Sequence, residues 1–332
     1  MNRKSIVKRV VSFDVIRAIA IVGIVFAHQL LSRDGLFPLA FGRWLGSTFS
    51  AVFLALSALL LGRAWHEKGR PAYGGRFLLH RFSRLVIPYW LFLTVFLMVA
   101  YATGHFFPVK DIALNYALLG WLAKISGMGH FWFITMISIC YVAIVIISRL
   151  FQADWWRRFL PVMLTMGCAG LYALLAHYRL PAYMAFILLY YCLLFVYADS
   201  ILEMFRRHGK RIVRIGTPIL LLLMPGLFVS GTLTGGNDNL IVMGCSLCGI
   251  AIFSVLQVIL STVKKCPRFL SDLSGVSYEW YLVHHPMIIG PVALSQFIPS
   301  RPVTVVCYWV VSICCAFLLK YLTSFSSRLF HA

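Results

Sequence analysis

Three ionisable residues in the first apolar segment have the types and spacing of a reactive site. Asp14, Arg17 and His28 occur within residues 11–31, among apolar neighbours. At about 100° per residue, the step from Arg17 to His28 is roughly 20° beyond three helical turns, so a helix places both on one face. Asp14 precedes Arg17 by one turn on the same stripe. An imidazole there can take a proton, and a guanidinium can stabilise a developing oxyanion. The alternative is a structural Asp14–Arg17 pair with His28 in a buried hydrogen bond.

A basic pair follows further along the chain. Arg81 and Arg84 are three residues apart, and Pro88 comes after them. On a helix the two guanidiniums share a face and can hold phosphate oxygens bidentately. The pair therefore predicts a phosphate-binding site, with simple anchoring at a membrane surface as the alternative.

Histidines and aromatic residues recur near the starts of two later apolar segments. His130 and Trp132 begin one, and Tyr281 and His284 share a helix face in another. A neutral imidazole in lipid still needs hydrogen-bond partners. We therefore treat all four as candidates for lining the site, although Trp132 is equally typical of an aromatic belt. Three further residues in the segment that carries Tyr281 and His284 are weaker candidates: Tyr278, Glu279 and His285.

The composition shows which elements must position these residues. Of 332 residues, 61% are hydrophobic and 12% are charged, and the mean hydropathy is +0.86. Soluble proteins have about 45–50% apolar and about 25% charged residues. The apolar residues form runs of about 18 or more, which predicts membrane-spanning helices and not barrel strands. We predict an all-α polytopic membrane protein that forms a single domain over residues 1–332.

The apolar runs predict about ten spans, and the loop charges predict their orientation. With both termini in the cytoplasm, most of the 30 Lys and Arg residues fall in cytoplasmic loops. Residues 111–126 are shorter and more polar, and we predict an interfacial or re-entrant segment there. The predicted spans are 11–31, 46–64, 83–103, 130–149, 159–176, 181–200, 211–230, 239–261, 277–297 and 302–324.

Two other function classes fit the sequence poorly. The net charge of +20 could suggest nucleic-acid binding, but the basic residues lie between apolar runs and not on one folded surface. The nine cysteines lie mostly inside apolar runs, where a free thiol packs as a small hydrophobe. Cys245 and Cys248 form a C-x-x-C without a second pair, so we predict no metal site.

Taken in order, these motifs resemble the acyltransferase-3 family, whose members are integral membrane O-acyltransferases. The resemblance starts from D-x-x-R and R-x10-H at Asp14, Arg17 and His28, followed by Phe53 and Ser57. It continues over nearly the whole chain, and the family's frequent Ser-Gly is Ser57-Ala58 here. The later motifs are R-x-x-R-L-x-x-P-Y-W from Arg81, H-F-W-F from His130 and S-Y-x-x-Y-L-x-H-x-P from Ser277.

The resemblance implies an O-acetyltransferase of the stand-alone form in the bacterial cytoplasmic (inner) membrane. Acetyl-CoA would be the co-substrate, with no bound cofactor, and a cell-surface or lipid-linked glycan would be the acceptor. Arg81 and Arg84 would bind the donor phosphates, and Arg17 would position the thioester. His28 would act as the base, or as a nucleophile through an acetyl intermediate. A transporter or flippase of lipid-linked sugars is the alternative function, in which the same basic residues would line the pathway of a pyrophosphate headgroup.

Overall fold

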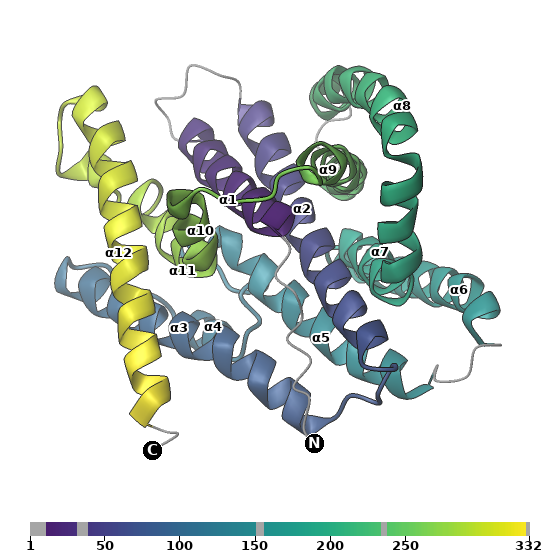
Figure 1. Cartoon of the computed structure of the whole chain (residues 1–332). Coiled ribbons are helices and arrows are strands. Elements are labelled where there is room, and N and C mark those ends of the chain that lie inside the picture. The colour runs from purple at the N-terminus through teal and green to yellow at the C-terminus, as the bar shows by residue number, and fades with distance from the viewer. Residues whose placement is uncertain (1–10, 32–38, 151–155, 234–237, 330–332) are drawn as a thin grey trace. The chain divides into compact units, whose positions relative to one another are not determined.

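The computed structural model describes residues 11–31, 39–150, 156–233 and 238–329. In these ranges every long regular element is an α-helix, and no strand occurs, so the predicted all-α class is confirmed (Figure 1). Helices are the expected outcome because each satisfies its backbone hydrogen bonds within its own segment. The described residues group into two compact units, which we treat separately. The prediction of a single domain remains a prediction.

Unit 1 comprises described residues within Met1–Ala20, Ser47–Ala72 and Ile146–Ser274. Its buried core includes Phe13, Phe205 and Phe253, which bring three helices together. Within this unit α8 packs on α9, and α6 packs on α7 (Figure 1). Its helices are the first part of α1 (Val11–Leu31), most of α2 (Leu39–Glu67), the end of α5 (Trp132–Leu150), α6 (Trp156–His177), α7 (Tyr183–Val196), α8 (Ala198–Leu233), α9 (Asp238–Leu260) and most of α10 (Arg268–Gly275).

Unit 2 comprises described residues within Ile21–Gly46, Tyr73–Val145 and Gly275–Ala332. In it α11 and α3 each pack against α12. The buried Tyr89 hydroxyl donates to the Asn115 carbonyl, which ties α3 to α4. Besides parts of α1, α2 and α5, its elements are α3 (Gly75–Ala102), α4 (Val109–Tyr116), η1 (Gly129–Phe131), α11 (Ser277–Val283), η2 (His285–Met287), η3 (Leu294–Gln296) and α12 (Arg301–Leu329).

Seven helices in the described part of the chain are long and apolar enough to cross a membrane, and one bent pair raises the number to eight. The bent pair is Tyr183–Val196 with Ala198–Pro218, at 75°. α4 has eight residues and is followed by turns, so residues 111–126 contain no helix of spanning length. The number of ten spans and the cytoplasmic placement of both termini stay predictions. The side chains of residues 219–238, which include part of the expected span 211–230, lie outside the described residues.

Residues 277–297 do not form the single helix that the apolar run led us to expect. α11 ends after seven residues, which is about 10 Å of helix against a hydrocarbon core of about 30 Å. Pro286 lacks a backbone N–H, and Gly290 has a φ of +112°. Both features end helical hydrogen bonding, so a short helix followed by 3₁₀ turns replaces the expected span.

The cysteines behave largely as the sequence predicts. All nine are free thiols. Cys140, Cys192, Cys245 and Cys248 are buried in helices, where they fill the core as small apolar groups.

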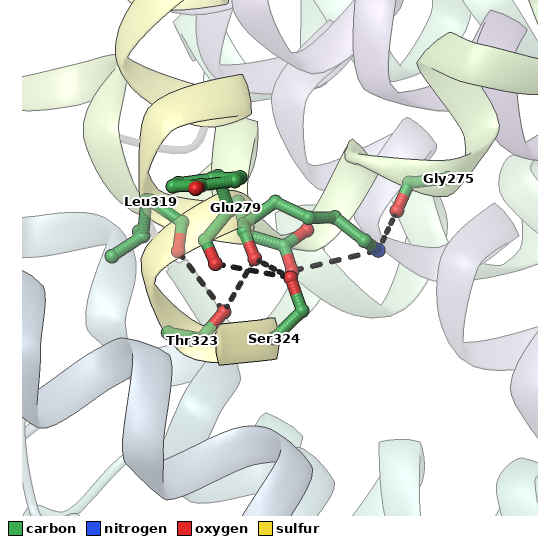
Figure 2. Close-up of polar contacts among 7 residues, drawn as sticks. Gly275, Glu279, Leu319, Thr323 and Ser324 are labelled. Atoms are coloured by element: carbon green, nitrogen blue, oxygen red, sulfur yellow. Dashed lines mark hydrogen bonds and ion pairs between the residues drawn. The ribbon is translucent and has the colours of Figure 1, made fainter. Parts of the chain in front are cut away.

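A polar junction joins the start of α11 to α12. The Lys320 ammonium donates to the carbonyl of Gly275, and it lies 3.7 Å from a carboxylate oxygen of Glu279. Figure 2 shows Glu279 near Thr323 and Ser324, with Gly275 further to the right; the hydroxyls of Thr323 and Ser324 donate to backbone carbonyls one turn earlier on α12. The Glu279 side chain is 10% exposed and that of Lys320 is 45% exposed. The Lys320 ammonium thus contacts both the last residue of α10 and a buried carboxylate.

This junction predicts energetic coupling between Lys320 and Glu279. Lys320→Met should lower the free energy of unfolding, because it leaves a mostly buried carboxylate without its cation. Adding Glu279→Gln should recover part of the loss. We expect a coupling on the order of 0.5–1 kcal/mol, small because Lys320 is nearly half exposed. A double-mutant cycle in mixed micelles measures it, and strictly additive effects would refute the coupling.

Candidate functional site

Four imidazole rings meet in unit 2. We call His28, His130, His284 and His285 the histidine cluster. The His28 ring centroid lies 4.5 Å from that of His285 and 4.9 Å from that of His284. The His130 ring stacks on His285 at 4.5 Å and lies 6.3 Å from His28. The structure therefore brings together three residues singled out from the sequence, and His285 with them.

Short and interrupted elements position these rings. His28 comes from α1, and His130 lies in η1, directly before α5. His284 caps the end of α11, and His285 begins η2. A helix end leaves carbonyl groups without intrahelical partners, and side chains can then bond to them.

Burial separates His28 from the other three rings. His284 is 0% exposed, His130 is 3% and His285 is 8%, whereas His28 is only half-buried. A ring that reacts with a substrate must be accessible to that substrate, whereas rings that only contact the reactive ring can be fully buried. Within the cluster His28 is therefore the best candidate for contact with a substrate.

Backbone carbonyls hold the three buried rings. Nδ1 of His284 lies 3.0 Å from the Trp280 oxygen, and Nδ1 of His285 lies 2.7 Å from the Gly127 oxygen. Nε2 of His130 lies 3.3 Å from the Leu282 oxygen. Each ring thus uses one nitrogen for the backbone. The Tyr281 hydroxyl donates to the His130 carbonyl, which places this predicted residue against the cluster.

His130 keeps one buried nitrogen without a partner. Its Nδ1 atom has no hydrogen-bond partner within the described residues. A buried unpaired polar atom costs about 1–3 kcal/mol, which is unusual in a packed interior. Such an atom is well suited to accept a hydrogen bond from a bound molecule.

Two glycines allow the backbone to come close behind the cluster. A Cβ atom at Gly290 would lie 2.9 Å from the Gly127 Cα atom, and Gly290 has a φ of +112°. A Cβ atom at Gly127 would lie 2.6 Å from the carbonyl oxygen of Ile289. Any larger side chain would push apart the segments that carry His130 and His285.

α12 fixes the half of α1 that carries His28. The Trp309 indole donates to the side chain of Gln29 at 2.7 Å, and the Tyr308 hydroxyl donates to the Val25 carbonyl at 3.3 Å. Both contacts flank His28 on α1, so they limit rotation of the helix that presents its ring.

The basic pair on α3 also belongs to unit 2. The Arg81 guanidinium lies 5.6 Å above the Phe77 ring, which itself stacks on Tyr73 at 4.3 Å. The Arg81 Nε atom is buried and lacks a hydrogen-bond partner in the part of the chain that the structure describes. Arg84 is exposed. An aromatic contact to one guanidinium and the exposure of the other suit a binding site for a highly charged ligand.

Arg17 and Asp14 lie in unit 1. The Arg17 guanidinium is 3.8 Å from the Asp14 carboxylate and 3.5 Å from the Ser274 hydroxyl. Ser274 in turn donates to Asp14 at 3.3 Å. The pairing of Asp14 with Arg17, which is the structural alternative to a reactive site, is thus present. The catalytic role of Arg17 stays a prediction.

Ser57 and Trp132 complete the predicted set. The Ser57 hydroxyl lies 3.0 Å from that of Tyr191 in unit 1. Trp132 is half-buried at the start of α5, two residues after His130. Glu279, a weaker candidate, pairs with Lys320 as described above.

Sequence reasoning gave His285 too little weight. On one continuous helix, adjacent residues point about 100° apart, so His284 and His285 would not both face His28. In the structure both rings nevertheless lie against His28, at the point where α11 passes into a 3₁₀ turn. The sequence does contain a signal for this interruption: Pro286 follows the two histidines, and the residue before a proline disfavours a continuing helix.

In the described part of the chain, no group of three or more His, Cys, Asp or Glu residues is arranged to hold a metal ion. The nitrogens of the histidine cluster that lie against backbone carbonyls suit hydrogen bonding and proton transfer.

Comparison with known proteins gives one match. The family model for the acyltransferase domain of the acyltransferase-3 type matches residues 10–323, essentially the whole chain. No curated protein and no solved structure matches significantly.

The approach of the two glycines predicts a large difference between two Gly→Ala variants. Gly290→Ala should reduce the free energy of unfolding by about 1–3 kcal/mol from overlap with Gly127, beyond its backbone strain. Gly104→Ala is the matched control, because Gly104 has a φ of +82° and nothing within 4 Å of its Cβ position. It should show only the left-handed strain of about 1–2 kcal/mol. Unfolding in detergent measures both, and equal losses would contradict the close approach.

Proposed function

Because the chain belongs to the acyltransferase-3 family, we propose that this membrane acyltransferase moves an acetyl group from acetyl-CoA to a glycan hydroxyl. The glycan is a cell-surface or lipid-linked saccharide, and the protein is a multi-pass component of the bacterial cytoplasmic membrane. The observation that carries the proposal is the half-buried residue His28, whose ring lies against three buried imidazoles.

In the proposed reaction His28 is the general base. It takes the proton from the acceptor hydroxyl as the hydroxyl oxygen attacks the thioester carbonyl carbon. When the carbon–sulfur bond breaks, the CoA thiolate receives that proton from His28. The products are an O-acetyl ester and CoA, so the protein needs no bound cofactor.

Two further assignments concern the donor. Arg81 and Arg84 bind the CoA phosphates from the cytoplasmic side, supported by the exposure of Arg84 and the unpaired Nε atom of Arg81. Arg17 stabilises the thioester oxygen as it gains negative charge. Its support is its charge and its partial exposure in unit 1.

His28→Ala should abolish glycan acetylation. In a deletion strain of the host that expresses either form at equal membrane levels, the wild type should restore the O-acetyl signal in proton NMR spectra of surface glycans. The variant should fall by at least about 10²-fold, the usual contribution of a general base. His105→Ala, which changes an exposed histidine, should behave as the wild type. Equal restoration by His28→Ala would exclude the proposed base.

Acetyl-CoA should raise the melting temperature of the purified protein in detergent. A ligand that binds the native state stabilises it by about 2.7 kcal/mol at 100 times its Kd. Arg84→Ala should weaken acetyl-CoA binding about tenfold or more, because a charge-assisted contact contributes about 1.5–3 kcal/mol. Arg158→Ala removes an exposed charge from α6 and should leave binding unchanged. If acetyl-CoA does not stabilise the wild type, a transporter of lipid-linked sugars becomes the better proposal.

A further inference from the structure

A chain of hydrogen bonds leads from the backbone of α11 to His28. The Trp280 carbonyl lies 3.0 Å from Nδ1 of His284, and it also accepts the backbone N–H of His284 at 3.1 Å. On the other side of the same ring, Nε2 of His284 lies 2.8 Å from Nδ1 of His28. His284 is fully buried between these two contacts.

The chemistry of the contacts fixes where the protons lie. A carbonyl oxygen can only accept, so Nδ1 of His284 must carry a proton. In a neutral imidazole the other nitrogen is then unprotonated, so Nε2 of His284 accepts. The hydrogen bond at 2.8 Å therefore requires the proton on Nδ1 of His28.

The opposite direction of the hydrogen bond between His284 and His28 is energetically unfavourable. If Nε2 of His284 donated to His28, the His284 ring would carry protons on both nitrogens and a positive charge. An unpaired charge is strongly disfavoured in an apolar interior. The neighbouring His130 and His285 rings offer no counter-charge to it.

We propose that His284 is a positioning residue that holds His28 in the tautomer with a protonated Nδ1 and an unprotonated Nε2. The inference rests on the proposed function, because Nε2 is then the atom that takes the proton from the acceptor hydroxyl. When His28 gains that proton, its Nδ1–H bond to His284 strengthens, since hydrogen bonds from charged donors are stronger. The proton leaves again from Nε2 to the CoA thiolate, and His284 ends as it began.

Kinetics of two substitutions at His284 test this role. His284→Leu removes the acceptor and should lower kcat by about 10–100-fold, the usual effect of removing a group that orients a reactive one. The KM for acetyl-CoA should stay within about twofold. His284→Gln can turn its amide oxygen toward Nδ1 of His28 and should recover most of the loss. The exposed His105→Leu should match the wild type.

The same experiment separates a positioning role from a packing role. If His284 only filled space, Leu would be the better replacement and Gln the worse one. Equal activity of the Leu variant and the wild type, or a Gln variant weaker than the Leu variant, would overturn the proposal. Melting temperatures of both variants show whether either loses activity by unfolding.

A spectroscopic readout is independent of acyl transfer. Ring nitrogen NMR of ¹⁵N-histidine-labelled protein in nanodiscs distinguishes protonated from unprotonated nitrogens, and subtraction of the His28→Ala spectrum identifies His28. We expect a protonated Nδ1 and an unprotonated Nε2 in the wild type and in His284→Gln, and a changed pattern in His284→Leu. A wild-type His28 protonated at Nε2 would refute the inference, even if the protein proves to be an active transferase. The expected tautomer in a protein that transfers no acyl group would refute only the proposed function.

Discussion

A neutral imidazole away from water needs an acceptor for its N–H group, and this requirement shapes the histidine cluster of unit 2. The three buried rings of the histidine cluster each meet a backbone carbonyl. Two of these carbonyls belong to α11, and the third lies in the turn before η1. The carbonyls are accessible because the backbone there is at a helix end or in a turn. The interruption of the apolar run 277–297 therefore helps to place several histidines in one apolar region.

The remaining contacts of unit 2 keep this interrupted backbone in place. Lys320 bonds to the end of α10 and to Glu279 at the start of α11. The Tyr278 hydroxyl donates to the Leu85 carbonyl on α3. Gly127 and Gly290 let the following turns meet. A segment too short to be stable alone is thus held from α3, from α12 and from the turn before η1.

The sequence predicts the helical class and most of the cluster, because both depend on local patterns. Apolar runs determine helices, and ionisable residues inside such runs stand out by their cost. The prediction of one spanning helix over 277–297 was wrong because hydropathy depends only on how many residues are apolar. It does not show whether those residues continue a single helix. The inclusion of His285 and the partner of Glu279 could not be predicted either. They depend on where α11 stops and on which residues of other helices lie opposite, which no local spacing encodes.

Trp280 connects two parts of unit 2 through a single residue. Its indole donates to the Ser312 hydroxyl on α12 at 2.9 Å, while its carbonyl accepts two hydrogen bonds from His284. Rotation of the Trp280 peptide would withdraw both acceptor contacts at once. A series of hydrogen bonds therefore runs from Ser312 on α12 through Trp280 and His284 to the protonated nitrogen of His28. The protonation of a residue on α1 thus depends on the register of α12.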